Sequence, residues 1–279
     1  MARPFRAHLL AGGFPPGSAQ GHDHDYARIR ILEILEEKDI HCSVANDYKD
    51  LETWLPLSRV MITYTAGPIL DDRQSALVND WMASGGRWLA LHGTSGGRAA
   101  RIEGTNRRRM VKSSHHEALG GFFISHPPVR RFQVDVADDS HPLTRGLPKS
   151  FEVIDEPYMV EVLEPGKSKI LLTAELGPDP LPQKFGFSYD EDTALLADGK
   201  TRVIAYERPI GDGGVFYTTL GHCHSPSTNS QPFVDKSVDP EGKTPLLLRQ
   251  TWETDGYGQL LRNAIDWGMG ERPTEGDAR

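Results

Sequence analysis

The sequence predicts an α/β fold in which a mostly parallel sheet carries helices on both faces. In the first part of the chain, short apolar runs alternate with one-sided helical patterns, as expected for parallel strands joined by crossover helices. Several apolar runs break off at glycine or histidine, as strands do where they enter a turn. With 279 residues and 38% hydrophobic content, the chain suits one large domain, predicted at 1–279 with its core at about 6–269.

The first half of the chain supplies the parallel strands and their helices. Residues 7–10 form the first predicted strand, and a loop rich in glycine and proline leaves it. Residues 25–35 have apolar positions three and four apart, which indicates a helix with one buried face. A second helix, 71–83, opens with acids where the helix dipole favours them and closes at Gly85-Gly86. Further strands are predicted at 41–45, at 60–64 and in the run that ends at His92.

The second half predicts more strands, an added hairpin and a long loop. The polar, basic stretch 105–121 has no clear period and receives no assignment. The glycine-rich turn at 211–214 predicts a β-hairpin, residues 225–243 a long lid or binding loop, and residues 256–267 an amphipathic helix. Strands are predicted at 129–136, 151–156, 169–174, 203–207 and 215–220.

Composition excludes several classes of function. A net charge of -8 opposes nucleic-acid or anionic-membrane binding, and the basic run Arg107 to Arg109 is interpreted as a solvated loop. Cys42 and Cys223 lie too far apart for a disulfide framework or a cysteine zinc cluster. No run approaches the roughly 18 apolar residues of a membrane span. We therefore expect a soluble cytoplasmic protein, with homo-oligomer formation left open.

Three polar residues follow separate predicted strands and form the candidate catalytic set. His92 and His222 each end a strand, and Glu156 is the last residue of the strand 151–156. In open α/β sheets, ligands bind at the carboxyl ends of the strands, so these side chains should meet in one cleft. Imidazoles beside a carboxylate can act as an acid/base pair or hold a divalent metal ion such as zinc. The alternative is that both histidines only cap strand ends by bonding to the backbone.

Further residues near the strand ends are predicted to contact a substrate. In His22-Asp23-His24-Asp25, an aspartate is interpreted as the helix N-cap, and His24 can still point into the cleft. Thr94 and Ser95 offer hydroxyl groups to a sugar or an anion, although ordinary capping explains them equally well. The full predicted substrate-binding set is Gly13, His24, Thr94, Ser95, Tyr158 and His224.

These motifs, taken in order, resemble the ThuA-like (trehalose-utilisation) family over about residues 6–269. The matching parts are the histidine loop at His22 and His24, Leu-His-Gly at His92, Asp155-Glu156-Pro157-Tyr158, and Gly-x-Val-Phe-Tyr-Thr-x-Leu-Gly-His ending at His222. The resemblance implies a flavodoxin-like sheet similar to class I glutamine amidotransferases, in a family associated with bacterial sugar metabolism. The basic stretch 107–112 and the loop 225–243 have no place in that pattern.

The resemblance does not carry glutaminase activity with it. Such enzymes need a cysteine at the strand-to-helix turn, where this chain has His92. We expect a protein that acts on a small carbohydrate or keto-carbohydrate by proton transfer, as in hydrolysis or isomerisation, through His92, His222 and Glu156. Two alternatives stay open: a binding protein without catalysis, and a metal-dependent hydrolase.

Overall fold

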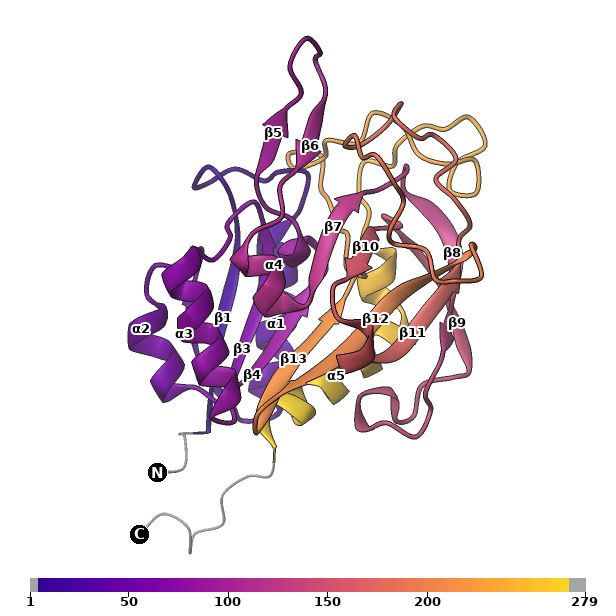
Figure 1. Cartoon of the computed structure of the whole chain (residues 1–279). Coiled ribbons are helices and arrows are strands. Elements are labelled where there is room, and N and C mark those ends of the chain that lie inside the picture. The colour runs from indigo at the N-terminus through magenta and orange to yellow at the C-terminus, as the bar shows by residue number, and fades with distance from the viewer. Residues whose placement is uncertain (1–4, 271–279) are drawn as a thin grey trace, which may run out of the picture.

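The computed structural model describes residues 5–270, in which a nine-stranded sheet runs through the molecule (Figure 1). The strand order is β2-β1-β3-β4-β13-β12-β11-β8-β9. The bounds of these strands are β1 (Arg6–Gly13), β2 (His41–Ala45), β3 (Val60–Ala66), β4 (Arg87–Leu91), β8 (Arg130–Val136), β9 (Ser150–Asp155), β11 (Lys169–Glu175), β12 (Thr201–Ile210) and β13 (Gly213–Thr218). The ends of the predicted domain 1–279 lie outside the described residues.

The sheet has a parallel half and an antiparallel half. From β2 through β1, β3 and β4 to β13, neighbouring strands are parallel, as the alternating patterns of the first half predict. From β13 through β12, β11 and β8 to β9, neighbours are antiparallel. The predicted hairpin turn at 211–214 joins β12 to β13, and β12 extends beyond the predicted 203–207 at both ends. The carboxyl ends of β1, β3, β4 and β13 therefore share one edge of the sheet.

Helices cover both faces, as predicted. Their bounds are α1 (His24–Glu37), α2 (Leu51–Trp54), α3 (Asp72–Ala83), α4 (Ser114–Leu119) and α5 (Asp255–Met269). Successive strand residues point to opposite faces, so Leu9 packs in one core with Ile31 and Leu260, whereas Leu10 packs in the other with Val78. The first core therefore lies under α1 and α5 and the second under α3. No helix within residues 5–270 combines the length and apolarity needed to cross a bilayer.

The unassigned stretch 105–121 contains regular structure that its sequence pattern does not reveal. Two short strands, β5 (Ala99–Arg101) and β6 (Arg108–Met110), form a hairpin that projects from the body of the molecule (Figure 1). Two of the three arginines interpreted as a solvated loop thus lie in a strand; they are solvent-exposed, and Arg109 pairs with Asp190 at 2.6 Å. Farther on, β7 (Gly121–Ser125) pairs with β10 (Met159–Val162), a partner too distant in sequence for a local pattern to identify.

Two buried histidines hold the turn that leaves β4. His115 accepts a hydrogen bond from the Leu70 amide and donates one to the Thr94 carbonyl at 2.7 Å. His116 donates to the Gly96 carbonyl at 3.0 Å. Both imidazoles are therefore neutral and hold the backbone after β4 in place through these hydrogen bonds. Burial, together with neighbouring His116, lowers the pKa of His115 to about 3.

Replacing His115 should make stability less sensitive to acid. The folded-state pKa of His115 lies below the ordinary 6.5, so the unfolded chain binds the proton first as pH falls. The stability present above pH 6.5 is then lost at about 1.4 kcal/mol per pH unit as pH falls from 6.5 towards 3. Urea unfolding from pH 7 to pH 4 should give a shallower slope for His115→Gln than for wild type. Parallel slopes would show that His115 is already protonated in the folded state.

Candidate metal centre

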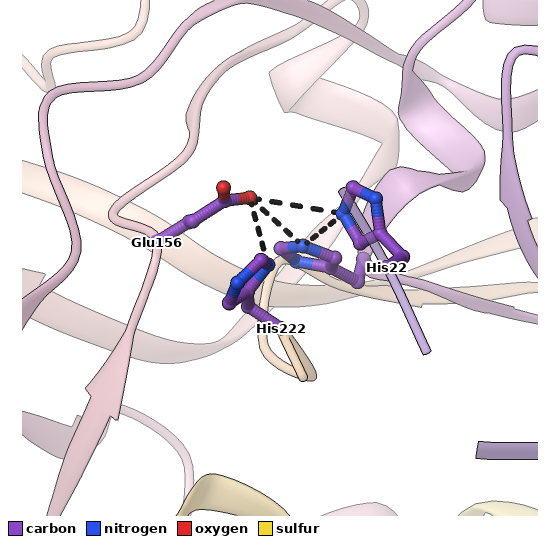
Figure 2. A group of neighbouring side chains, drawn as sticks. His22, Glu156 and His222 are labelled. Atoms are coloured by element: carbon purple, nitrogen blue, oxygen red, sulfur yellow. Dashed lines mark hydrogen bonds and ion pairs between the residues drawn. The ribbon is translucent and has the colours of Figure 1, made fainter. Parts of the chain in front are cut away.

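Four buried side chains converge at the carboxyl edge of the parallel strands. His22 precedes α1, His92 follows β4, Glu156 follows β9 and His222 follows β13. Each offers one nitrogen or oxygen atom, and the four atoms lie within 4.8 Å of one another. Figure 2 shows the Glu156 carboxylate facing the imidazoles of His22 and His222. None of the four residues is more than 7% exposed, so the cluster is shielded from bulk water.

His92 reaches the cluster through an unusual backbone conformation. Its φ is 44°, in the left-handed region that residues with a side chain rarely adopt. The neighbouring Gly93 passes so close to β3 that a Cβ atom there would lie 2.4 Å from the Thr65 carbonyl oxygen. This sharp turn begins η2 (His92–Ser95) and presents the imidazole at the end of the strand. Such strain persists only where the surrounding structure enforces it, and it concentrates at functional sites.

Asp155 holds two of the cluster residues in place. Its carboxylate accepts hydrogen bonds from the backbone amides of Gly221 at 2.8 Å, His222 at 3.0 Å and Glu156 at 2.8 Å. The last residue of β9 is thereby tied to the turn after β13, although 66 residues separate Asp155 from Gly221. Gly221 adopts a φ of +127°, and a Cβ atom there would lie 2.7 Å from the Tyr257 hydroxyl. This turn therefore requires glycine.

Hydrogen bonds outside the cluster fix the tautomers of the three histidines. A carbonyl oxygen only accepts, so the nitrogen facing it must carry the proton. His92 Nδ1 lies 2.6 Å from the Thr219 carbonyl, and His22 Nδ1 lies 2.7 Å from the Gln20 carbonyl. In each neutral ring, Nε2 is then left without a proton and faces the cluster.

His224 sets the tautomer of His222 in the same way. His224 Nε2 donates to the Pro245 carbonyl at 2.9 Å, so its Nδ1 accepts from His222 Nε2 at 3.0 Å. His222 Nδ1 is therefore also unprotonated, and it lies 3.3 Å from Glu156 Oε2. Three unprotonated nitrogens and one carboxylate oxygen thus face a common point.

The spacing of these four atoms fits a metal ion. His22 Nε2 and His92 Nε2 lie 3.1 Å apart, too close for two lone pairs with nothing between them. Glu156 Oε2 lies 3.2 Å from His92 Nε2 and 3.8 Å from His22 Nε2. Tetrahedral ligands 2.0–2.1 Å from zinc stand about 3.4 Å apart. Histidine and carboxylate ligands suit zinc and neighbouring divalent transition metals.

The charges in the cluster favour an ionised carboxylate among imidazoles. Burial opposes ionisation of Glu156, but His222, His126 and His92 outweigh it and hold its pKa well below the usual range. Burial lowers the pKa of His22 far below its usual value. Burial also disfavours the charged form of His92, yet Glu156 and Asp155 together raise its pKa. Without an ion, the cluster can therefore hold one proton between His92 and Glu156.

Comparison with known proteins places this architecture in a family. The sequence model of the ThuA family, described as trehalose utilisation, matches residues 17–236. The chain belongs to the ThuA family. That assignment confirms the resemblance inferred from the motifs and gives the protein a carbohydrate-related role. No curated protein sequence matches the chain.

Solved structures agree with the ThuA assignment at the level of the fold. A ThuA-like protein from Bacteroides uniformis has a TM-score of 0.62 and 17% identity, over 96% of this chain and 93% of that chain. A ThuA-like protein from Parabacteroides merdae has a TM-score of 0.58 and 16% identity, and the match covers 96% of this chain and 90% of that chain. A glutamine amidotransferase from Thermotoga maritima has a TM-score of 0.54 and 10% identity, and the match covers 97% of this chain and 100% of that chain. These likenesses establish the amidotransferase-like fold that the sequence predicts.

The two thiols of this ThuA protein are poor nucleophiles. Cys223 is fully buried, and burial raises its pKa to about 12. Burial likewise raises the pKa of Cys42 to about 11. Both groups are therefore protonated at neutral pH, whereas acyl transfer of the amidotransferase type needs a thiolate.

The other predicted site residues lie at different depths around the cluster. Tyr158 is buried and stacks on His92, with ring centroids 4.1 Å apart. Thr94 and Ser95 are also buried, and their hydroxyl groups already bond to Thr63 and Tyr217. The substrate-binding roles of these three residues stay predictions. His224 bonds to His222 from outside the four-residue cluster.

The loop before α1 supplies both a cap and a cluster residue. Asp23 is the N-cap of α1, as the sequence suggests, because its side chain accepts from the Tyr26 amide. His24 and Gly13 line a cleft beside the cluster. Burial lowers the pKa of His24 to about 4, so its imidazole is neutral near pH 7. His22, which sequence reasoning left outside the site set, is the residue that joins the cluster.

Gln231 is the second cluster neighbour that sequence reasoning missed. It lies in the segment 225–243, which contains no helix or strand, and its side-chain amide donates to Glu156 Oε1. Gln231 therefore holds Glu156 Oε1, the oxygen that faces His126 at 3.9 Å and does not face the three cluster histidines. The composition of this segment indicated a binding loop, and no sequence signal singled out this glutamine within it.

Proposed function

We propose that this ThuA protein is a metal-dependent enzyme that moves a proton next to a carbonyl group of a carbohydrate. The observation that supports the proposal most is the tautomer arrangement: His22, His92 and His222 all direct unprotonated nitrogens at one point beside an ionised carboxylate. Three protein ligands and one open position are typical of catalytic zinc sites. In this assignment the three imidazoles would hold the ion, the fourth position would stay open for the substrate, and Glu156 lies beside it as the base.

The chemistry follows from a Lewis acid next to a base. The ion would polarise a sugar carbonyl oxygen and so acidify the hydrogen on the adjacent carbon. Glu156 Oε2 would take that proton as the C–H bond breaks, while the electron pair moves onto the oxygen held by the ion. Return of the proton to the former carbonyl carbon, with the proton of the adjacent hydroxyl group passing to the former carbonyl oxygen, would complete an isomerisation. The carbohydrate class comes from the family's role in trehalose utilisation.

Solvent-exchange measurements test this function directly. Chelated protein, zinc-loaded protein and zinc-loaded Glu156→Gln would each be incubated in D2O with aldoses and keto-sugars derived from glucose and trehalose. We expect deuterium beside the carbonyl only with the zinc-loaded wild type, as followed by NMR. Glu156→Gln should retain zinc but exchange at least about 100-fold more slowly, because general-base catalysis contributes about that much. Sugar binding without exchange or product would instead identify a binding protein.

His224 should tune the affinity for the ion without touching it. His224→Leu removes the acceptor for His222 Nε2, so the His222 ring is free to rotate or to place its proton on the wrong nitrogen. Loss of such a supporting hydrogen bond costs about 10- to 100-fold in metal affinity. Competition with a chelating dye would measure the zinc affinity, with the exposed His41→Leu as control. Equal affinities for the two variants would contradict the tautomer argument.

A further inference from the structure

A cleft of about 340 Å³ lies at the carboxyl end of β1 and the start of α1, next to the metal centre. Among the described residues that line the cleft, His22 is the one that also belongs to the four-residue cluster. His22 is 7% exposed, whereas Glu156 is 2% exposed and His92 and His222 are fully buried. An ion that enters along this cleft therefore reaches His22 before the other three residues of the cluster.

The imidazole of His24 lies in the wall of the cleft with one nitrogen unused. His24 Nε2 is buried and has no hydrogen-bond partner among the described residues. His24 is only 8% exposed, and a Cβ atom on Gly13 in the same wall would lie 3.3 Å from His24 Cε1. Buried polar groups in native proteins are nearly always hydrogen-bonded, so an exception calls for an explanation. An imidazole nitrogen is also a good ligand for zinc and related ions.

His24 and His22 are neighbours in space as well as in sequence. Their ring centroids lie 6.0 Å apart, and both rings contact the ring of Tyr64. The bond from His22 Nδ1 to the Gln20 carbonyl leaves His22 Nε2 for the ion. An ion bound to His24 is therefore one side chain away from the first ligand of the cluster.

The described lining of the cleft presents no unpaired cation that would repel an ion. Arg28, the cation of the lining, donates to Asp25 Oδ1 at 2.6 Å, and Asp23 pairs with Arg249 at 3.1 Å. Because both carboxylates have arginine partners, neither would hold an arriving ion back. The chain carries a net charge of -8, and a negative potential raises the local concentration of cations.

We infer that this cleft is the route by which the metal ion enters and leaves the centre, with His24 as a transient ligand that passes the ion to His22. The inference rests on the metal ion of the proposed function and not on its sugar chemistry. It gives a role to the unused His24 nitrogen, which lies outside the four-residue cluster.

The inference predicts a distinctive kinetic effect for His24→Leu. A residue that serves only the route changes the rates of binding and release by the same factor, because Kd depends only on the free and bound states. Stopped-flow mixing with a chelating dye would measure zinc uptake by metal-free protein and zinc release from loaded protein. We expect both rates to fall about tenfold, the lower end of the effect of a focusing cleft, while Kd stays unchanged. The exposed His41→Leu should match the wild type in both rates.

Filling the cleft gives a second test that does not depend on His24. Ala19→Phe adds a large side chain to the lining, and Ala100→Phe adds the same side chain to the exposed strand β5 as a control. We expect Ala19→Phe to slow both uptake and release, and Ala100→Phe to slow neither.

Two results would overturn the inference. One is zinc exchange at wild-type rates by either folded variant, His24→Leu or Ala19→Phe. The other is a higher Kd for His24→Leu caused by faster release alone, which is the effect of losing a permanent ligand or a structural support. A wild type that binds no zinc would instead count against the metal centre. Normal zinc rates without deuterium exchange into sugars would count against the proposed sugar chemistry alone.

Discussion

Alanine at any one of His22, His92 or His222 is expected to abolish stoichiometric zinc binding by an otherwise folded protein. Each replacement removes one of three converging nitrogens and leaves a partial site. Removing a direct ligand should cost more than the about 100-fold that loss of a supporting residue can cost. Elemental analysis after gel filtration and competition with a chelating dye would both report the loss. His41→Ala, an exposed histidine on β2, is the matched control and should bind zinc normally.

The same variants should lose the stabilisation that the ion provides. An ion that binds only the folded state adds about 4 kcal/mol at a free concentration 1,000 times its Kd. Wild type should therefore unfold at a clearly higher temperature with zinc than with chelator, and the three variants should show no such difference. The metal centre would be refuted if zinc does not change the unfolding temperature of the wild type. It would also be refuted if zinc raises the unfolding temperature of the three variants as much as that of the wild type.

Asp155→Ala is expected to cause the largest loss of stability among single changes near the site, roughly 3–5 kcal/mol. The buried carboxylate accepts from three backbone amides, and alanine would leave all three without partners in a place that water does not reach. Zinc affinity should fall as well, because Glu156 and His222 both depend on this anchor. Urea unfolding at neutral pH would measure the free energy.

Asp155→Asn separates hydrogen bonding from the presence of a side chain. The amide keeps one acceptor oxygen but turns an NH2 group towards a backbone amide, so we expect an intermediate loss. Asp135→Ala on β8 removes an exposed carboxylate and should change stability by no more than about 0.5 kcal/mol. A loss below about 1 kcal/mol for Asp155→Ala would show that the turn after β13 is held by other contacts.

Local pattern was enough to predict most strands of the sheet and three of the four cluster residues. The strand ends at His92 and His222 are visible because apolar runs stop there, and the rule for parallel sheets places both at one edge. Glu156 follows from the same reasoning, since it ends the run 151–156. The pairing of β5 with β6 and of β7 with β10 was not predictable, because each short strand depends on a partner that its own sequence does not indicate.

His22 shows why the remaining site residues needed the folded chain. Its neighbour Asp23 donates its backbone amide to the Cys223 carbonyl at 2.8 Å, so the loop before α1 is held by the turn after β13. Gln231 reaches Glu156 only because its loop folds back over the sheet edge. Neither contact leaves a periodic trace in the sequence.

The sequence by itself determined the α/β class, the strand ends that carry His92 and His222, and the ThuA motifs. These features are local, since side-chain periodicity and turn chemistry act over a few neighbouring residues. Only the tertiary structure decided which atoms of those residues are free to bind. The carbonyls of Gln20, Thr219 and Pro245 fix the protons on His22, His92 and, through His224, on His222. Carbonyl positions depend on how distant segments pack, so the chemistry of this site emerges only from the fold.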